Sequence, residues 1–399
     1  MNILFVSAVL PYPLYSGGQI RIYNLLKSLS SRHAITLYSF IRDREEYKYL
    51  TSFAFCKRVE TVLRGHAWQP RYIISSIVGM YPLLLASYNN IEMKSRLAEE
   101  LKTHSYDLIH LEPSYVWPSL PHTDIPTIIT EHNIEHTIYE GYVRRFPIAP
   151  FRPFLYIDVA KLGWWERHIW RKAMHIIAVS DNDLMYIQQH ATHTDVTVVP
   201  NGVDIDEFDF RPKKYIPMDA PVFLFVGSFT WMQNRDAVVW LVTSIWPTLR
   251  KRYPGATLRI VGRSMPSTLR KLISNHQVML LEHVESIEEE LHNADLLLAP
   301  IRIGGGTSFK ILEAMASGLP VVTTTLGAAG LNVTHGKEVL IGNTEEELVA
   351  AVDMLLASSK KRAEIARNAR KTIEQEYAWD NIAHTLDRVW EGTAKRMSL

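Results

Sequence analysis

The stretch "ADLLLAPIRIGGGTSFKILEAMASGLPVVTTT", residues 294–325, reads as a strand, a glycine turn, a helix and a second strand in direct succession. A short apolar run precedes three consecutive glycines, and the helical segment that follows them ends at Gly318 and Pro320. Strand, turn and helix in this order form the repeating unit of parallel α/β sheets. Because each glycine loses backbone entropy on folding, we expect this turn to bring its N–H groups against a ligand.

Similar apolar runs recur along the whole chain, separated by stretches long enough for a helix. They are nearly continuous rather than alternating, which is typical of strands that helices cover on both faces. Such an alternation of strands and helices predicts parallel sheets with right-handed crossovers. The predicted strands lie within residues 2–10, 34–40, 106–112, 126–132, 174–180 and 196–200, and then within 221–229, 257–263, 278–284, 294–301, 319–325 and 338–342.

The polar segment 201–221 contains prolines, lacks periodicity and separates the two series of strands. A chain of 399 residues is also too long for one ordinary hydrophobic core. We therefore predict an α/β protein of two doubly wound domains, residues 1–202 and 203–376, facing each other across a cleft. An amphipathic helix within 377–399 is expected to pack toward the first domain. Ligands of such sheets bind beyond the carboxyl ends of the strands.

The composition is that of a soluble globular protein and excludes several classes of function. Apolar residues make up 47% and charged residues 21%, and 43 Lys and Arg against 42 Asp and Glu leave a net charge of +1. This balance argues against a protein that coats nucleic acid. Cys56 is the only cysteine, which excludes internal disulfides and a thiolate zinc cluster. The N-terminus lacks the features of a signal peptide, so a cytoplasmic location is expected.

Two segments raise the question of contact with a membrane. Residues 72–88 are apolar but too short to span a bilayer comfortably, and Pro82 interrupts them, so a core or interfacial helix is expected. Residues 154–175 combine three tryptophans with arginine and lysine, which suits either a contact at headgroup level or a helix that packs its tryptophans inward. Both interpretations stay open, and with them a peripheral contact at the inner face of the membrane.

The glycine turn at residues 304–306 is predicted to bind phosphate. The start of the following helix carries unsatisfied N–H donors and a partial positive charge, and Thr307 and Ser308 can cap it and donate hydrogen bonds. Lys310 would add a charge for a diphosphate. Glu313, on the same helix face, could accept two hydroxyls of a ribose. An ordinary surface helix with an i,i+3 ion pair is the alternative.

The familiar phosphate motifs do not match this turn, because the P-loop pattern is absent and Phe309 stands where a dinucleotide fingerprint needs glycine. The segment instead resembles the donor-binding segment of the retaining family 4 glycosyltransferases, which have the two-domain GT-B fold. The resemblance spans most of the chain and is strongest from Val198 to Gly330. It also includes "PYPLYSGGQIRIYNLL" (11–26), "AVSDND" (178–183), "VVPNGVDIDEF" (198–208), "FVGSFTWMQNRDAVVWL" (225–241) and "LRIVGR" (258–263).

The resemblance implies roles for particular residues. The family glutamate equivalent to Glu313 holds the nucleotide ribose, and the turn holds the diphosphate and sugar. A second family glutamate is replaced by Gly305, which leaves the sugar unidentified. Ser228 and Asn234 stand where the family commonly has arginine and lysine, so Lys310 is expected to carry more of the phosphate charge. The donor-binding residues that the resemblance implies are Gly17, Gly18, Ser228, Asn234, Arg263, Val284, Gly304, Gly305, Gly306, Thr307, Ser308 and Glu313.

In the first domain, Gly17 and Gly18 follow the first predicted strand and could bring N–H groups to the donor phosphate or the acceptor; a tight turn is the alternative. His132 begins an H-x-x-E-H pattern known from zinc peptidases, which need both histidines on one helix. The β-branched run before it predicts instead that His132 ends a strand. The resemblance implies a histidine here that contacts the donor sugar or its phosphate. We therefore predict His132 and Lys310 as catalytic residues, and no metal.

The predicted reaction is transfer of a hexose-type sugar from a nucleoside-diphosphate sugar to a hydroxyl, with retention of anomeric configuration. The resemblance implies that the departing diphosphate assists the incoming hydroxyl, and UDP is expected from its frequency in the family. A glycan or lipid-linked acceptor is expected, with no nucleic acid and no cofactor beyond the donor. Asp204 and Asp206 imitate the D-x-D of metal-dependent transferases but lie in the linker. An epimerase of the same fold and a non-catalytic nucleotide-sugar binder are the alternatives.

Overall fold

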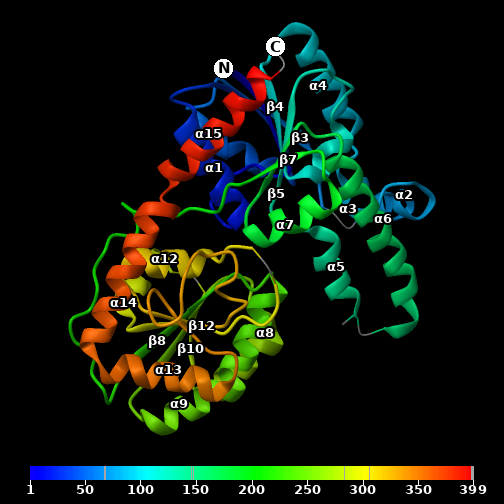
Figure 1. Ribbon diagram of the computed structural model, residues 1–399. Helices are drawn as coiled ribbons and strands as arrows, with labels where there is room; N and C mark the ends of the chain where they lie inside the picture. The colour runs from blue at the N-terminus through cyan, green and yellow to red at the C-terminus, as the bar shows by residue number, and fades with distance from the viewer. Residues whose placement is uncertain (67–68, 145, 147, 283, 305, 397–399) are drawn as a thin grey trace. The chain divides into compact units, whose positions relative to one another are not determined.

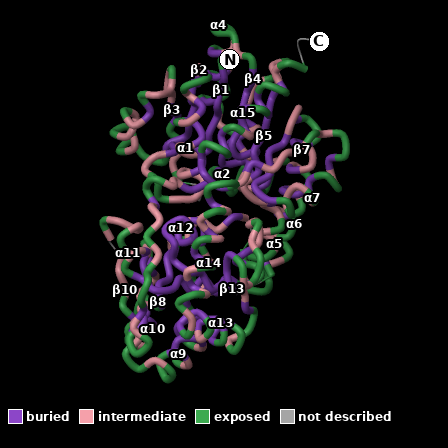
Figure 2. The backbone as a smooth tube through the Cα atoms, turned by 60° about the vertical axis from the view of Figure 1, so that its left-hand side comes forward, coloured by how far each residue is buried: buried purple, intermediate pink, exposed green. Residues whose placement is uncertain are grey.

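The computed structural model describes residues 1–66, 69–144, 146, 148–282, 284–304 and 306–396 (Figure 1). The chain forms two compact units. Unit 1 comprises Met1–Pro200 together with Ile382–Leu399, and unit 2 comprises Asn201–Asn381. Each unit contains one parallel sheet with helices packed against it, so the prediction of two doubly wound α/β sheets is confirmed. Buried residues gather along strands such as β1 and β8 (Figure 2).

The sheet of unit 1 has seven strands in the order β3-β2-β1-β4-β5-β6-β7, and its paired strands are parallel. The order changes direction between β1 and β4, which is the position where open α/β sheets bind ligands. The strands are β1 (Asn2–Ser7), β2 (Ala34–Ile41), β3 (Arg58–Leu63), β4 (Leu108–Glu112), β5 (Thr127–Glu131), β6 (His175–Ala178) and β7 (Asp195–Val198).

The helices of unit 1 lie between these strands in chain order. They are α1 (Gly17–Leu29), η1 (Arg44–Phe53), α2 (Pro70–Val78), α3 (Leu83–Tyr88), α4 (Ile91–Thr103), η2 (Ser114–Ser119), α5 (Glu135–Arg144), η3 (Ala149–Phe151), α6 (Arg152–Trp170) and α7 (Asp181–His190).

The sequence patterns did not predict β3. Its residues "RVETVL" mix polar and apolar side chains without a regular period, and the strand lies at the edge of the sheet, where only part of it is buried. Such a mixed run of six residues is a weaker signal than the continuous apolar runs of the strands inside the sheet.

The sheet of unit 2 has six parallel strands in the order β10-β9-β8-β11-β12-β13. Alternate residues of β8 enter two different core clusters, Phe223 and Phe225 in one, Leu224 and Val226 in the other. This two-sided burial explains the continuous apolar run. The strands are β8 (Val222–Val226), β9 (Thr257–Val261), β10 (Met279–Leu281), β11 (Leu296–Ala299), β12 (Val321–Thr323) and β13 (Leu340–Ile341).

The helices of unit 2 contribute residues to both of these core clusters and pack against the strands. They are α8 (Met232–Trp240), η4 (Leu241–Ile245), α9 (Trp246–Arg252), α10 (Ser267–Asn275), α11 (Ile287–Asn293), α12 (Phe309–Ser317), α13 (Glu345–Ala357), α14 (Ser359–Thr372) and η5 (Ile373–Tyr377).

The last helix, α15 (Trp379–Lys395), begins in unit 2 and belongs to unit 1 from Ile382 onward. In unit 1 the Trp390 side chain is fully buried, and its indole N–H donates to Nδ1 of His110 at 3.0 Å. Burial lowers the pKa of His110 to about 4, so this ring is neutral at pH 7. Asp387 binds Nε2 of His33 at 2.7 Å. These buried polar contacts hold the helix on the first sheet.

The two apolar segments of the sequence both form helices of unit 1. Residues 72–88 are divided between α2 and α3, and the break falls at residues 79–82, beside Pro82 as expected. In α6 the tryptophans differ: Trp170 is buried, Trp165 is half-buried and Trp164 is exposed. Within the described ranges, no helix combines the length and apolar character needed to cross a membrane.

Candidate functional site

The predicted donor-binding residues of unit 2 lie beyond the carboxyl ends of its strands. Ser228 follows β8, Arg263 follows β9, Val284 follows β10, and the glycine turn follows β11. The neighbouring strands β8 and β11 stand where the strand order changes direction, which is the expected ligand position of such a sheet. Gly305, the middle glycine of the turn, lies outside the described residues.

The backbone of the turn explains two of its glycines. Gly304 has φ +119° and Gly306 has φ +74°, values that residues with a side chain rarely adopt. Ser308 is the N-cap of α12, as predicted, but its side chain does not make the expected capping hydrogen bond. Since the first N–H groups of a helix have no intrahelical acceptor, the start of α12 offers donors to a ligand. Thr307 beside it is buried.

Lys310 is held by the segment that follows β8. Its Nζ donates to Oδ1 of Asn234 at 2.6 Å and lies 4.6 Å from the centre of the Phe225 ring. The amide of Asn234 is buried and donates in turn to the carbonyl of Ser228 at 2.8 Å. Burial lowers the pKa of Lys310 to about 8, although the charge of Glu313 opposes this shift. Lys310 thus takes Asn234 as its partner, and the alternative of an i,i+3 ion pair with Glu313 is not formed among the described residues.

Glu313 lies one turn further along α12 and is half-buried. Burial is the main cause that raises its pKa to about 7, and the carboxylates of Glu207 and Glu288 add to the effect. The charge of Lys310 acts in the opposite direction. Hydrogen-bond donors would stabilise the ionised form of a carboxylate in such surroundings, and the hydroxyl groups of a ligand would be such donors.

In unit 1 the predicted glycine loop is the first turn of a helix. Gly17 and Gly18 open α1, and the side chain of its N-cap, Ser16, accepts the N–H of Gln19. A Cβ on Gly18 would lie 3.2 Å from Cε1 of His132, closer than most Cβ atoms approach a neighbour. Glycine therefore allows His132 to lie against the start of this helix, so two of the predicted site residues meet here.

His132 directly follows β5 and binds a buried carboxylate. Its Nε2 lies 2.7 Å from Oε1 of Glu112, the last residue of β4. A neutral imidazole with Nε2–H on a carboxylate presents Nδ1 as an acceptor, so Glu112 selects both the tautomer and the ring orientation. The same Glu112 oxygen accepts Nε of Arg21 at 2.8 Å. Burial alone would raise the pKa of Glu112, but Arg21 and His132 hold it at about 2.

Sequence reasoning missed Glu112 and Arg21. Both side chains are almost completely buried, and Arg21 also donates to the carbonyl of Pro200 at 2.7 Å. The available signal was a charged residue at the carboxyl end of an otherwise apolar strand, "LIHLE" at 108–112. Isolated carboxylates are rarely buried, so such a residue indicates either a partner or a ligand.

The two sequence patterns that resemble metal sites, H-x-x-E-H at 132–136 and D-x-D at 204–206, are explained by other contacts. His132 precedes α5 and binds Glu112, whereas His136 lies in α5 and binds Glu166, so the two histidines do not share a helix. In the linker, Oδ1 of Asp204 accepts the N–H groups of Asp206 and Glu207, each at 3.0 Å. This local turn is typical of aspartate in loops.

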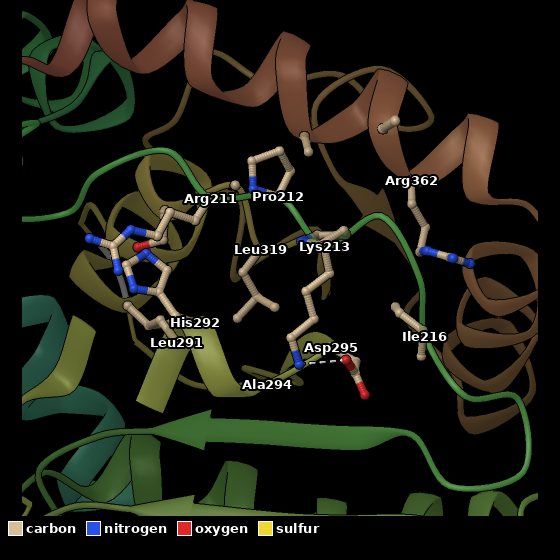
Figure 3. A pocket seen from close by; sticks show the side chains of 15 residues that line it. Arg211, Pro212, Lys213, Ile216, Leu291, His292, Ala294, Asp295, Leu319 and Arg362 are labelled. Atoms are coloured by element: carbon tan, nitrogen blue, oxygen red, sulfur yellow. Dashed lines mark hydrogen bonds and ion pairs between the residues drawn. The ribbon is translucent and has the colours of Figure 1, made fainter. Parts of the chain in front are cut away.

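A separate hollow of unit 2 lies at the amino ends of the strands (Figure 3). Asp295 and Pro320, which directly precede β11 and β12, line it together with Lys213. The ammonium of Lys213 binds Asp295 at 2.8 Å, and Arg211 and Arg362 also line the hollow. None of the predicted site residues lines it. Ligands of parallel sheets bind at the opposite edge, so we assign this hollow to the packing of the linker.

Comparison with known proteins shows which families this chain resembles. Residues 15–207 match the family described as "Glycosyltransferase Family 4", and residues 220–358 match "Glycosyl transferases group 1". An uncharacterised 44.6 kDa protein in the cps region of Klebsiella pneumoniae is 24% identical over 395 residues, covering 94% of this chain and 96% of the relative.

A second relative and a solved structure extend the comparison. A GDP-mannose-dependent alpha-(1-6)-phosphatidylinositol monomannoside mannosyltransferase of Mycobacterium tuberculosis is 26% identical over 319 residues, which is 69% of this chain and 80% of the relative. Anabaena HepE, solved in complex with UDP-glucose, superimposes with a TM-score of 0.67 at 16% identity, covering 98% of this chain and all of that one. The fold is therefore GT-B.

Proposed function

We propose that this chain, a family 4 glycosyltransferase with the GT-B fold, transfers a hexose from a UDP-sugar to a hydroxyl acceptor with retention of anomeric configuration. The observation that carries the proposal is the position of Lys310, whose ammonium is held by Asn234 beside the glycine turn at the switch point of the second sheet. A preorganised cation next to backbone N–H donors suits the charge that develops on a departing diphosphate.

Each residue of unit 2 then has a defined task. The turn at Gly304 and Gly306 and the start of α12 donate N–H groups to the diphosphate. Lys310 stabilises the negative charge that grows on it as the bond to the sugar breaks, and Glu313 accepts the ribose hydroxyls. A phosphate oxygen takes the proton of the incoming hydroxyl on the same face of the sugar, so no covalent enzyme intermediate and no metal are part of the proposal.

His132 completes the proposed set of catalytic residues. Its ring is oriented by Glu112 and leaves Nδ1 as an acceptor, which suits a hydrogen bond to a hydroxyl of the transferred sugar. Glu112 and Arg21 act through His132 and are positioning residues.

The nucleotide and the acceptor belong to the proposal as well. UDP is supported by the likeness to HepE, which was solved with UDP-glucose, whereas the mycobacterial relative is named for GDP-mannose. A glycan or lipid-linked acceptor is supported by the names of the relatives, one from a cps region and one acting on phosphatidylinositol monomannoside.

Thermal-shift measurements with UDP, GDP and their hexose conjugates test the donor first. We expect UDP and one UDP-hexose to raise Tm, and release of UDP from that hexose conjugate to require or be accelerated by an acceptor hydroxyl. Stabilisation by GDP alone would contradict the choice of base. Conversion of the donor to an epimer without acceptor, or binding with no release of diphosphate under any acceptor, would contradict glycosyl transfer itself.

A further inference from the structure

Helix α2 exposes its apolar side instead of burying it. Tyr72 and Ser76, one turn apart, face the interior. The other side carries Ile73, Ile74, Ile77 and Val78, and Ile77 and Val78 are 73% and 81% exposed. An ordinary surface helix shows the reverse arrangement, with its apolar stripe toward the core.

Helix α6 carries a second exposed apolar row. Phe154 is 70% exposed, and Ile157 and Trp164 follow at helical spacing. Phe151, immediately before the helix, is exposed as well. The inward side of α6 is occupied by Val159, Leu162, Glu166, Ile169 and Trp170, so this outer row is not needed for the core.

Specific contacts place the two rows beside each other, as the neighbouring positions of α2 and α6 in Figure 1 also show. Nζ of Lys161 on α6 donates to the carbonyls of Ser76 and Gly79, at 2.8 Å and 2.9 Å. The indole N–H of Trp165 donates to the carbonyl of Met80 at 3.0 Å, and Met80 is itself 74% exposed. The rows of α2 and α6 therefore form one surface, which we name the α2–α6 face.

The charged groups near the α2–α6 face are basic on the outside. Arg71 is the single charged residue of the stretch 69–80. Within 152–172 the two acids both have internal partners: Asp158 accepts from Ser76 and from the N–H of Leu83, and buried Glu166 accepts from the N–H of Glu135. Of the cations in the same stretch, Arg152 and Lys161 donate to backbone carbonyls, whereas Arg171 and Lys172 are exposed.

From these observations we infer that the α2–α6 face binds the surface of an anionic lipid bilayer. A contiguous apolar patch rimmed by cations is the pattern of segments that lie in the membrane interface, with apolar side chains inserted to about 5–10 Å and basic groups at the headgroups. A second copy of this chain would bring the same cations together, which disfavours self-association. The described helices do not span a bilayer, so the contact is peripheral. This inference goes beyond the proposed transfer reaction and does not depend on it.

Vesicle flotation of the full-length protein tests the inference. Vesicles of phosphatidylcholine with phosphatidylglycerol should carry the protein, and vesicles of phosphatidylcholine alone should carry much less. Ile77→Glu/Phe154→Glu should weaken binding by at least about tenfold, because two carboxylates replace the inserted side chains. Met354→Glu, at an exposed apolar position on α13, should bind as the unchanged protein does.

Two further measurements complete the design. Circular dichroism and Tm confirm that the variants are folded, and Ile77→Ser/Phe154→Ser provides an uncharged pair that should weaken binding to a smaller degree. The inference is overturned if the unchanged protein fails to float with anionic vesicles, or if the glutamate pair floats as well as Met354→Glu. It is also overturned if sedimentation shows a dimer that the glutamate pair dissociates, since the face would then join two copies of the chain.

Discussion

The ammonium nitrogen of Lys310 lies 2.6 Å from Oδ1 of Asn234, which joins the segment after β8 to the helix after β11. The two residues are separated by 76 positions in the chain. The resemblance assigned a phosphate role to the position of Asn234, which carries no charge here. Its side-chain carbonyl oxygen instead positions the ammonium of Lys310, the cation that we propose for the phosphate.

Replacing Lys310 by methionine should lower kcat by about 100-fold, with a smaller change in KM for the donor. The lost ammonium acts mainly on charge that appears as the sugar leaves, and removing one such group costs on the order of 10²–10³ in rate. Steady-state kinetics with the identified donor measure this. Lys337→Met, on an exposed lysine, is the control and should leave kcat unchanged. An unaltered kcat in Lys310→Met would refute the assigned role.

Replacing Glu313 by glutamine should raise KM for the donor by about tenfold and affect kcat less. An ionised acceptor is exchanged for a neutral amide, and a hydrogen bond to a charged group contributes about 1.5–3 kcal/mol. Calorimetric titration with UDP measures the affinity directly. Equal affinities of the two proteins for UDP would show that Glu313 does not bind the ribose.

The same two residues predict a bell-shaped pH profile. kcat/KM reports the free enzyme, in which Glu313 ionises at a pKa of about 7 and Lys310 loses its proton at a pKa of about 8. Activity should fall below pH 7, as Glu313 gains a proton, and above pH 8, as Lys310 loses its charge. Glu313→Gln should flatten the acid limb and keep the alkaline limb. Persistence of the acid limb in that variant would assign it to another group.

Replacing Glu112 by glutamine should destabilise unit 1 by about 3 kcal/mol, because the buried guanidinium of Arg21 loses its counter-charge. Urea unfolding measures the change, and Glu60→Gln, on a partly exposed glutamate, is the control. The pKa of Glu112 is lowered in the fold to about 2, so its contribution is present above the ordinary value and lost as pH falls toward 2. The variant should therefore lose less stability on acidification than the unchanged protein.

The sequence predicted the strands best where both faces are buried. The continuous run of β8 could be recognised because Phe223 and Leu224 enter different cores, whereas the edge strand β3, with its irregular mixture of polar and apolar residues, could not. The glycine turn could be recognised from its three consecutive glycines. The φ values of Gly304 and Gly306 explain why these positions favour glycine.

The rest of the candidate site depends on contacts between distant parts of the chain. Arg21 and Glu112 are separated by 91 positions, and nothing local to either residue identifies the other as its partner. The tryptophans of α6 show the same limit. Their spacing admits an inward or an outward orientation, and only the packing of α6 against its neighbours separates buried Trp170 from exposed Trp164.

The route of α15 has a consequence for the synthesis of the protein. Unit 1 takes its last helix from the end of the chain, after all of unit 2 has been made. On the ribosome, the first sheet emerges early, yet Trp390 cannot reach His110 until all of unit 2 has been synthesised. Unit 2, continuous in sequence, can fold as soon as it leaves the exit tunnel. We therefore expect unit 2 to fold before α15 completes unit 1.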